Sequence, residues 1–251
     1  MNQLAFVFGL LGNVVSFMVF LSPIPTFYKI YKKNSTEGFQ SVPYVVGLFS
    51  ATLWIYYAFL KPDTTLLITI NSVGCVVQTA YICFYLFFAP KKVQTVRLLF
   101  LLNVVGLGLI VLLTHFLAKD SHRADIVGWI CLLFNLCVFV APLCVLRQVI
   151  QTKSVEYMPF LLSFFLTLSA VMWFFYGLLL RDYNIAVPNV LGFIFGVLQM
   201  VLYAIYKHNG KKVVQIKQQQ LSDIQISQII NAAETKEQTV IDVLKLSTAP
   251  I

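Results

Sequence analysis

The sequence predicts an all-α membrane protein with seven transmembrane helices, arranged as two parallel three-helix bundles joined by a linker helix. The first observation behind this prediction is composition: 59% of the 251 residues are hydrophobic and only 11% are charged. A soluble domain of this size would carry about 25% charged residues. The second observation is an internal repeat, in which a segment that holds three expected spans recurs further along the chain.

The charged residues form short clusters separated by apolar stretches of roughly 20 residues, the helix length that crosses the hydrocarbon core. Helices are expected because backbone groups in lipid must be satisfied within the segment, and the alternating pattern of a barrel strand does not occur. We expect the first stretch to be retained, since no basic residue precedes it and it exceeds a signal-peptide core. The expected spans are residues 4–28, 41–60, 65–89, 98–118, 126–147, 159–180 and 184–206.

The internal repeat is visible as identical residues at a nearly constant offset. The matched pairs are Pro23 with Pro142, Ser50 with Ser169, Trp54 with Trp173 and Tyr57 with Tyr176 at an offset of 119, then Asn71 with Asn189 and Gly74 with Gly192 at 118. We therefore expect a first repeat at 4–89, a linker helix at 98–118, a second repeat at 126–206 and a mostly disordered cytosolic tail at 207–251. Three spans and a linker make an even number, so both repeats enter the membrane in the same direction.

The basic residues predict the orientation, because Lys and Arg gather on the cytosolic side of a membrane protein. Most of them follow the odd-numbered spans, and the exceptions are Lys61, Lys119, Arg123 and Arg181. The N-terminus is therefore expected outside the cell and the C-terminus in the cytosol, with the plasma membrane as the expected location. The net charge of +8 follows from this topology, and no nucleic-acid partner is expected. The cysteines and histidines show no metal spacing, so neither a metal nor a cofactor is expected.

Two tryptophans and two asparagines are expected at one depth of the membrane. Trp54 and Asn71 each lie about six residues, or roughly 9 Å, from the outer ends of their spans, and Trp173 and Asn189 lie at matching positions in the second repeat. A single buried Asn often only joins helices, and a Trp is often an interfacial anchor. The duplication at one depth instead predicts a binding site. An amide both donates and accepts hydrogen bonds, and an indole offers a flat apolar face, which together suit a sugar.

No Asp, Glu, Lys or Arg lies near the middle of any expected span. Transporters coupled to protons or ions normally carry an ionisable residue there. The sequence therefore favours uncoupled, bidirectional movement of a neutral solute.

Several motifs together resemble the signatures of the plant SWEET (MtN3/saliva) sugar transporters over roughly residues 4–206. They include Leu21-Ser22-Pro23, Lys33-Asn34-Ser35-Thr36-Glu37-Gly38-Phe39, Val42-Pro43-Tyr44, Thr152-Lys153-Ser154-Val155-Glu156-Tyr157-Met158-Pro159-Phe160, Trp173-Phe174-Phe175-Tyr176-Gly177 and Val187-Pro188-Asn189. The resemblance implies a sugar uniporter that works by alternating access. It assigns sugar binding to Asn71, Asn189, Trp54 and Trp173.

The same resemblance implies two gates. A proline tetrad near the cytosolic side corresponds to Pro23, Pro43, Pro142 and Pro159, where bent helices would let the halves rock. An outer gate corresponds to Tyr57 and Asp182, although Asp182 beside Arg181 could equally form a solvated pair in a loop.

The sequence looks most similar to the sucrose-transporting subgroup of this family. Small residues that line the pocket in that subgroup match Ser16, Val19, Ser50, Val138 and Ser169, whereas hexose-type members tend to carry Leu and Met in place of the two valines. Asn135 departs from this pattern, since Ser is common there, and it could alter hydrogen bonding in the pocket. A hexose-selective member of the family remains an alternative.

Other function classes fit the sequence less well. A seven-span receptor would lack the internal repeat, and its DRY-type and NPxxY motifs do not occur. An intramembrane enzyme would need a catalytic pair within the spans, and the sequence holds none. A PQ-loop transporter of amino acids would usually need charged partners for a zwitterion. The expected partners are a sugar, membrane lipid and other family members in homo- or hetero-oligomers.

Overall fold

The computed structural model describes residues 2–153, 155 and 160–207, and the regular structure of these residues is helical without a strand. Seven helical segments within them are long and apolar enough to cross a membrane, which confirms the predicted fold class. They are Gln3–Lys33, Val42–Phe59, Thr65–Phe88, Val93–Leu117, His122–Thr152, Phe160–Leu179 and Tyr183–Lys207. Apart from Lys207, the expected tail lies outside the described residues.

The first and fifth spans are each divided into two helices at equivalent positions. The first consists of α1 (Gln3–Phe20) and α2 (Ile24–Lys33), and the fifth of α7 (Asp120–Val138) and α8 (Val140–Thr152). A proline accompanies each break, because its ring removes one backbone hydrogen bond and crowds the preceding turn. Both α2 and α8 end on a residue in the left-handed region, at Asn34 (φ 52°) and Lys153 (φ 55°). These two helices explain why both spans run beyond the limits expected from hydrophobicity.

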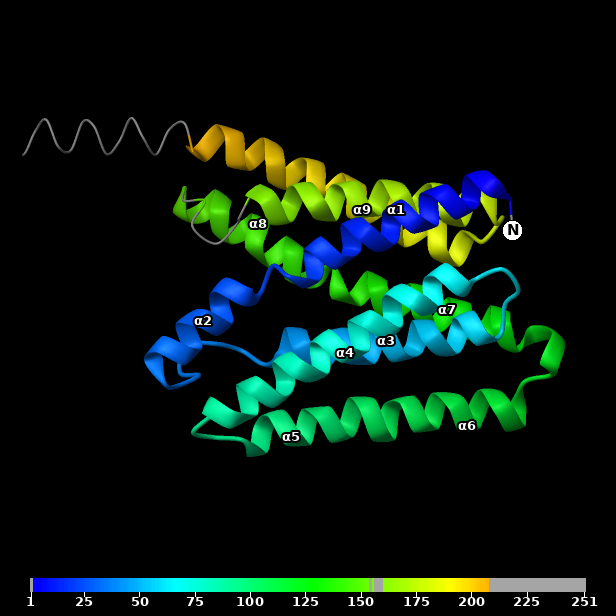
Figure 1. The fold of residues 1–251 in the computed structure, drawn as a ribbon, viewed down its shortest axis with the longest axis horizontal. Helices are drawn as coiled ribbons and strands as arrows, with labels where there is room; N and C mark the ends of the chain where they lie inside the picture. The colour runs from blue at the N-terminus through cyan, green and yellow to red at the C-terminus, as the bar shows by residue number, and fades with distance from the viewer. Residues whose placement is uncertain (1, 154, 156–159, 208–251) are drawn as a thin grey trace, which may run out of the picture.

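The remaining helices complete the two repeats and the linker. They are α3 (Val42–Phe59), α4 (Thr65–Phe88), the linker elements α5 (Val93–Leu99), η1 (Phe100–Gly106) and α6 (Leu107–Leu117), then α9 (Phe160–Leu179) and the last span, Tyr183–Lys207. In the first repeat α4 lies between α1 and α3 (Figure 1). The linker packs against α3 and α7, and its π-helical stretch at η1 was not expected from the sequence.

Among the labelled helices, the repeats meet most extensively between α1 and α9 and less extensively between α3 and α7. The buried face of α1 is made of small residues: Ala5, Gly9, Gly12 and Ser16. A Cβ atom added to Gly9 would lie 2.8 Å from the Tyr176 ring, and one added to Gly12 would lie 3.0 Å from the Trp173 indole. Close helix approach through small residues is the usual way that helices associate in lipid, where hydrophobic burial drives little. These small residues therefore allow the first span to pack closely against the sixth.

The two ends of the bundle differ in charge and in closure. The N-terminus and the basic ends of α2 and the last span lie at opposite ends of the long axis (Figure 1). At the basic end α2 packs on α4, and Leu146 and Val149 of α8 pack against the last span, each within its own repeat. The contacts that cross between repeats gather towards the N-terminal end, so a space between the repeats is closed more tightly on that side.

Candidate substrate cavity

A cavity of about 400 Å³ lies between the two repeats and is lined from both of them. It includes residues of α1, α3, α4, α7, α8, α9 and the last span. Among the residues predicted to bind substrate, Ser16, Val19, Trp54, Asn71, Asn135, Val138, Ser169, Trp173 and Asn189 line this space. None of the lining residues, all of which belong to the described part of the chain, carries a charge. The cavity is therefore apolar with a few neutral polar groups, as small-molecule sites generally are.

Three asparagine amides face this space in one shared arrangement. The Nδ2 group of Asn71 donates to the carbonyl of Leu67 at 2.8 Å, and that of Asn189 donates to Ile185 at 2.7 Å. Asn135 donates to the carbonyl four residues earlier in the same way, at 2.9 Å. Each bond fixes the amide against its own helix and leaves the amide oxygen and a second N–H for a ligand.

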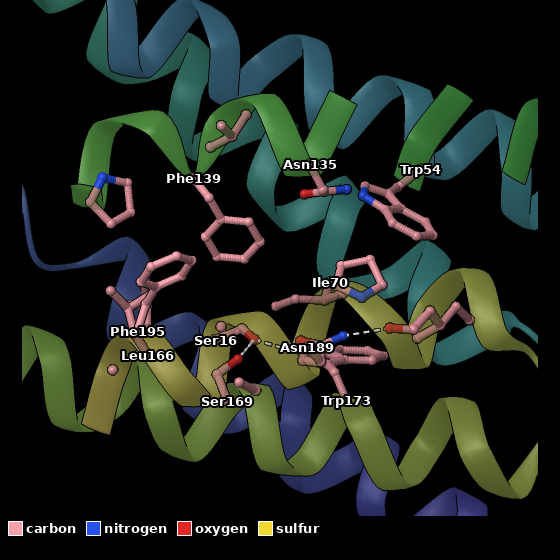
Figure 2. Close-up of a pocket in the computed structure, with 18 of the residues that line it drawn as sticks. Ser16, Trp54, Ile70, Asn135, Phe139, Leu166, Ser169, Trp173, Asn189 and Phe195 are labelled. Carbon is pink, nitrogen blue, oxygen red and sulfur yellow. Dashed lines mark hydrogen bonds between the residues drawn. The ribbon is translucent and has the colours of Figure 1, made fainter. Parts of the chain in front are cut away.

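The two tryptophans differ in how firmly they are held. Trp173 is 8% exposed, and its Nε1 donates to the Ser16 hydroxyl at 3.0 Å. That hydroxyl also lies 2.9 Å from the hydroxyl of Ser169, so a polar chain joins α1 to α9 (Figure 2). Trp54 is half-buried and meets Tyr57 edge to face at 5.5 Å between ring centroids. Trp173 is thus fixed between the repeats, whereas Trp54 stands opposite it beside Asn135 (Figure 2).

Ser50 is the one predicted pocket residue outside the lining of this cavity. It is half-buried in α3, although its repeat mate Ser169 lines the space. The two repeats differ in the residue that is available to hydrogen-bond with Ser50 or Ser169. Ser169 meets the hydroxyl of Ser16, whereas the residue equivalent to Ser16 is Asn135, whose amide bonds back to its own helix.

The sequence reasoning missed several lining residues nearer the basic end of the cavity. Phe139 and Phe195 lie 5.3 Å apart between ring centroids, and they face each other at one end of the space (Figure 2). Gln199 lines the cavity, and its Oε1 accepts a hydrogen bond from Ser163 at 3.0 Å. The signal for Gln199 was available, because it is an uncharged polar residue within a span. The aromatic pair gave no signal, since Phe is common throughout the spans.

At the N-terminal end the two residues of the expected outer gate bond directly. The Tyr57 hydroxyl donates to the Asp182 carboxylate, with oxygen–oxygen distances of 2.6 and 2.8 Å. Asp182 is 5% exposed and also accepts from the backbone N–H of Asn184 at 3.1 Å, while Lys61 Nζ lies 3.8 Å away. The alternative of a solvated loop pair with Arg181 is therefore wrong. A second contact crosses the repeats nearby, where the Tyr176 hydroxyl donates to the backbone carbonyl of Asp63 at 3.2 Å.

Three of the four tetrad prolines lie in the described residues. Pro23 stands between α1 and α2, Pro142 lies in the first turn of α8 and lines the cavity, and Pro43 lies in the first turn of α3. The fourth, Pro159, lies outside the described residues. Two of the prolines thus stand where spans one and five break.

Taken together, a duplicated bundle of seven spans with a neutral cavity between its halves is the architecture of a membrane transporter. A family described as "Sugar efflux transporter for intercellular exchange" matches residues 6–93 and 125–211, so its model fits the chain twice. The chain is 56% identical over 247 residues to the bidirectional sugar transporter SWEET10 of Arabidopsis thaliana, covering 98% of this chain and 81% of that protein. It is 60% identical over 204 residues to SWEET13 of rice, covering 80% and 69%.

A solved structure of a eukaryotic SWEET transporter has the same fold. It superposes with a TM-score of 0.76 at 36% sequence identity and covers 82% of this chain and 97% of that one. The chain therefore belongs to the SWEET (MtN3/saliva) family of sugar transporters. It is an integral membrane transporter and not an enzyme.

Proposed function

We propose that this protein is a bidirectional, uncoupled facilitator that moves sucrose across the plasma membrane by alternating access. The observation that carries the proposal is a cavity into which equivalent Trp and Asn residues project from both repeats. Its lining offers amides for sugar hydroxyls and indoles for the C–H faces of sugar rings. Relatives such as SWEET10 are named bidirectional sugar transporters, which supports the sugar and the two directions.

The absence of charge in the described lining supports the uncoupled mechanism. A proton or sodium gradient can drive a carrier only if the carrier binds the ion, and such sites normally use ionisable or closely placed oxygen ligands. The neutral amides and hydroxyls here hydrogen-bond a sugar without binding a proton at physiological pH. The sugar gradient alone then sets the direction of transport.

The shape of the basic half of the cavity supports a disaccharide. Val19 and Val138 are repeat mates, both line the cavity, and both are short β-branched residues. One ring would occupy the level of the tryptophans and asparagines, and the second ring would extend past the valines towards Phe139 and Phe195. A longer side chain at either valine would leave room for a single hexose, which is the competing assignment within the same family.

The contacts between repeats support an alternating-access cycle in which this structure is closed at the N-terminal end. Tyr57 with Asp182 and Tyr176 with Asp63 join the repeats there, whereas α2 and α8 each pack within their own repeat at the basic end. The distribution of basic residues supports an orientation with the N-terminal end outside the cell. Opening to the outside would then require the Tyr57–Asp182 contact to break as the prolines at the span breaks let the basic end close.

The test removes the amides that would bind the sugar. An unmade buried hydrogen bond costs about 1–3 kcal/mol, or roughly 5–150-fold in affinity. Asn71→Ala and Asn189→Ala should each abolish measurable sucrose uptake while surface expression is unchanged. Thr69→Ala serves as a matched control, because Thr69 is an exposed polar residue on the same helix as Asn71 and does not line the cavity. Uptake at the wild-type rate in either Asn variant would move the site elsewhere.

A further inference from the structure

A second hollow of about 410 Å³ lies outside the substrate cavity, between α2 and α4. It is lined by Ile24, Phe27, Tyr28, Tyr31, Ala80, Tyr81 and Phe84, and thus almost entirely by aromatic and aliphatic side chains. We call it the α2–α4 groove. It lies on the half of the bundle nearer the basic end, since α2 ends at Lys32 and Lys33. Its residues belong to spans one and three of the first repeat and line no part of the substrate cavity.

The groove has a fixed floor and an open rim. Phe27 is 6% exposed, stacks on Tyr81 at 4.4 Å with the rings nearly parallel, and meets Phe84 edge to face at 5.5 Å. Tyr81 is itself held by a 2.8 Å hydrogen bond from its hydroxyl to the carbonyl of Phe20. At the rim, Tyr28 is 57% and Tyr31 is 63% exposed. An exposed apolar groove on a membrane protein faces acyl chains, and tyrosines at its rim suit the level of the headgroups.

A cation stands at the same rim. Lys32 Nζ lies 5.0 Å from the centre of the Tyr28 ring, so its ammonium group is held beside the groove. Lys33, the next residue of α2, instead donates to the carbonyl of Glu37 at 2.8 Å. A lysine at the membrane surface attracts anionic headgroups.

The internal repeat provides a comparison for this groove within the same chain. At the offsets of the repeat, Phe27, Tyr28, Tyr31 and Lys32 correspond to Leu146, Arg147, Ile150 and Gln151, while Ala80, Tyr81 and Phe84 correspond to Leu198, Gln199 and Leu202. The second repeat thus lacks the aromatic walls and the small residue in the groove, and its cation, Arg147, stands at the position of Tyr28 and not at that of Lys32. The residues that line the substrate cavity are matched between the halves far more closely. The groove is therefore not a by-product of the shared three-helix fold.

We propose that the α2–α4 groove binds one anionic phospholipid from the leaflet at the basic end of the protein. An acyl chain would lie along Phe27, Tyr81 and Phe84, over the small side chain of Ala80. The phosphate would lie between Lys32 Nζ and the hydroxyls of Tyr28 and Tyr31, which can donate hydrogen bonds to it. Since α2 follows the break at Pro23, the lipid would contact the element that must move when the basic end closes.

The experiment measures lipid retention and does not depend on transport. The purified full-length protein is examined by native mass spectrometry with phosphatidylglycerol and phosphatidylcholine of identical acyl chains. The wild type should retain one phosphatidylglycerol in preference to phosphatidylcholine. Lys32→Gln, which installs the residue of the second repeat, should weaken this preference about fivefold. Ala80→Trp should block binding of either lipid in the groove, and its position on an exposed helix face keeps the fold intact.

Lys207→Gln is the matched control, because Lys207 Nζ lies 5.0 Å from the Tyr203 ring in the same arrangement, in the second repeat. It should retain the lipid as the wild type does. Equal retention of the two phospholipids would show ordinary annular lipid and overturn the proposal. An equal loss in Lys207→Gln would show general attraction to the basic surface, and a protein dimer that excludes the lipid would show that a second copy fills the groove. Either result would also overturn it.

Discussion

The contact between Tyr57 and Asp182 can be tested directly as the interaction that holds the N-terminal end closed. Tyr57→Phe removes only the hydroxyl that donates to the carboxylate at 2.6 and 2.8 Å. Asp182 is 5% exposed, so water replaces that donor poorly as long as this end stays closed. In a conformation open to the outside, the carboxylate would be hydrated in the variant and the wild type alike. The substitution therefore acts mainly on the closed state.

The magnitude follows from the bond that is lost. Hydrogen bonds to charged groups contribute about 1.5–3 kcal/mol. Removing this one, together with the longer 3.3 Å bond that the same hydroxyl accepts from Asn184 Nδ2, should shift the ratio of closed to open conformations by roughly 10–150-fold. Asn184 N–H and Lys61, which still face the carboxylate, place the expected effect in the lower part of that range.

The repeat offers a matched control for this substitution. Tyr176 is the counterpart of Tyr57, and its hydroxyl also crosses between the repeats, but it meets a neutral backbone carbonyl at the longer distance of 3.2 Å. A neutral hydrogen bond contributes about 0.5–1.5 kcal/mol. Tyr176→Phe should therefore shift the same equilibrium by no more than about tenfold.

The assay follows access to the cavity from the N-terminal side. A cysteine replaces Val138 in a background without the five native cysteines, and a membrane-impermeant thiol reagent is added outside intact cells. The labelling rate should rise strongly in Tyr57→Phe and modestly in Tyr176→Phe. Equal rates in Tyr57→Phe and the parent protein would refute the idea that this contact holds the end closed. An equal rise in both variants would show that the charge of Asp182 is unimportant.

Three further predictions concern selectivity, the Trp173 contact and orientation. Val19→Leu combined with Val138→Met should lose sucrose transport and keep glucose transport, because the cavity wall gains bulk where the second ring would lie; unchanged sucrose uptake in a radiotracer assay would contradict this. Ser16→Ala leaves the buried Trp173 N–H without its acceptor, at a cost of about 1–3 kcal/mol, and should weaken uptake more than Ala at the equivalent Asn135; the reverse order would remove Trp173 from the site. The sequon at Asn34 should stay unglycosylated, since it follows α2 on the basic side; an endoglycosidase-sensitive band lost in Asn34→Gln would reverse the orientation.

The sequence predicted the spans and most of the residues that line the cavity, because both depend on spacings that can be counted along the chain. Span length follows from the hydrocarbon thickness, and the depth of Trp54 and Asn71 follows from the rise of a helix. The duplication then indicated that their mates in the second repeat share that depth. These arguments needed no knowledge of which helices touch.

What the sequence could not predict depends on the choice of partner helix. The bond from Trp173 to Ser16 exists because α1 packs on α9, and that packing depends on side-chain fit along the Gly9–Gly12 face. The difference between Ser169 and Ser50 has the same origin, since only Ser169 meets a serine across the interface. The difference between Ser16 and Asn135 is visible in the sequence, but the helix that each of them meets is not. The π-helical stretch in the linker likewise left no signal in hydropathy.

The measurement that tests uncoupled sucrose transport most directly is the plateau of radiolabelled sucrose in proteoliposomes that contain the purified protein. With sucrose outside only, uptake should stop when the internal and external concentrations are equal. Vesicles loaded with sucrose should release it until the internal and external concentrations are equal. This result should not depend on a pH gradient or a protonophore. Accumulation above the external concentration that collapses with the protonophore would contradict this mechanism. Vesicles that equilibrate glucose but never sucrose would contradict the substrate.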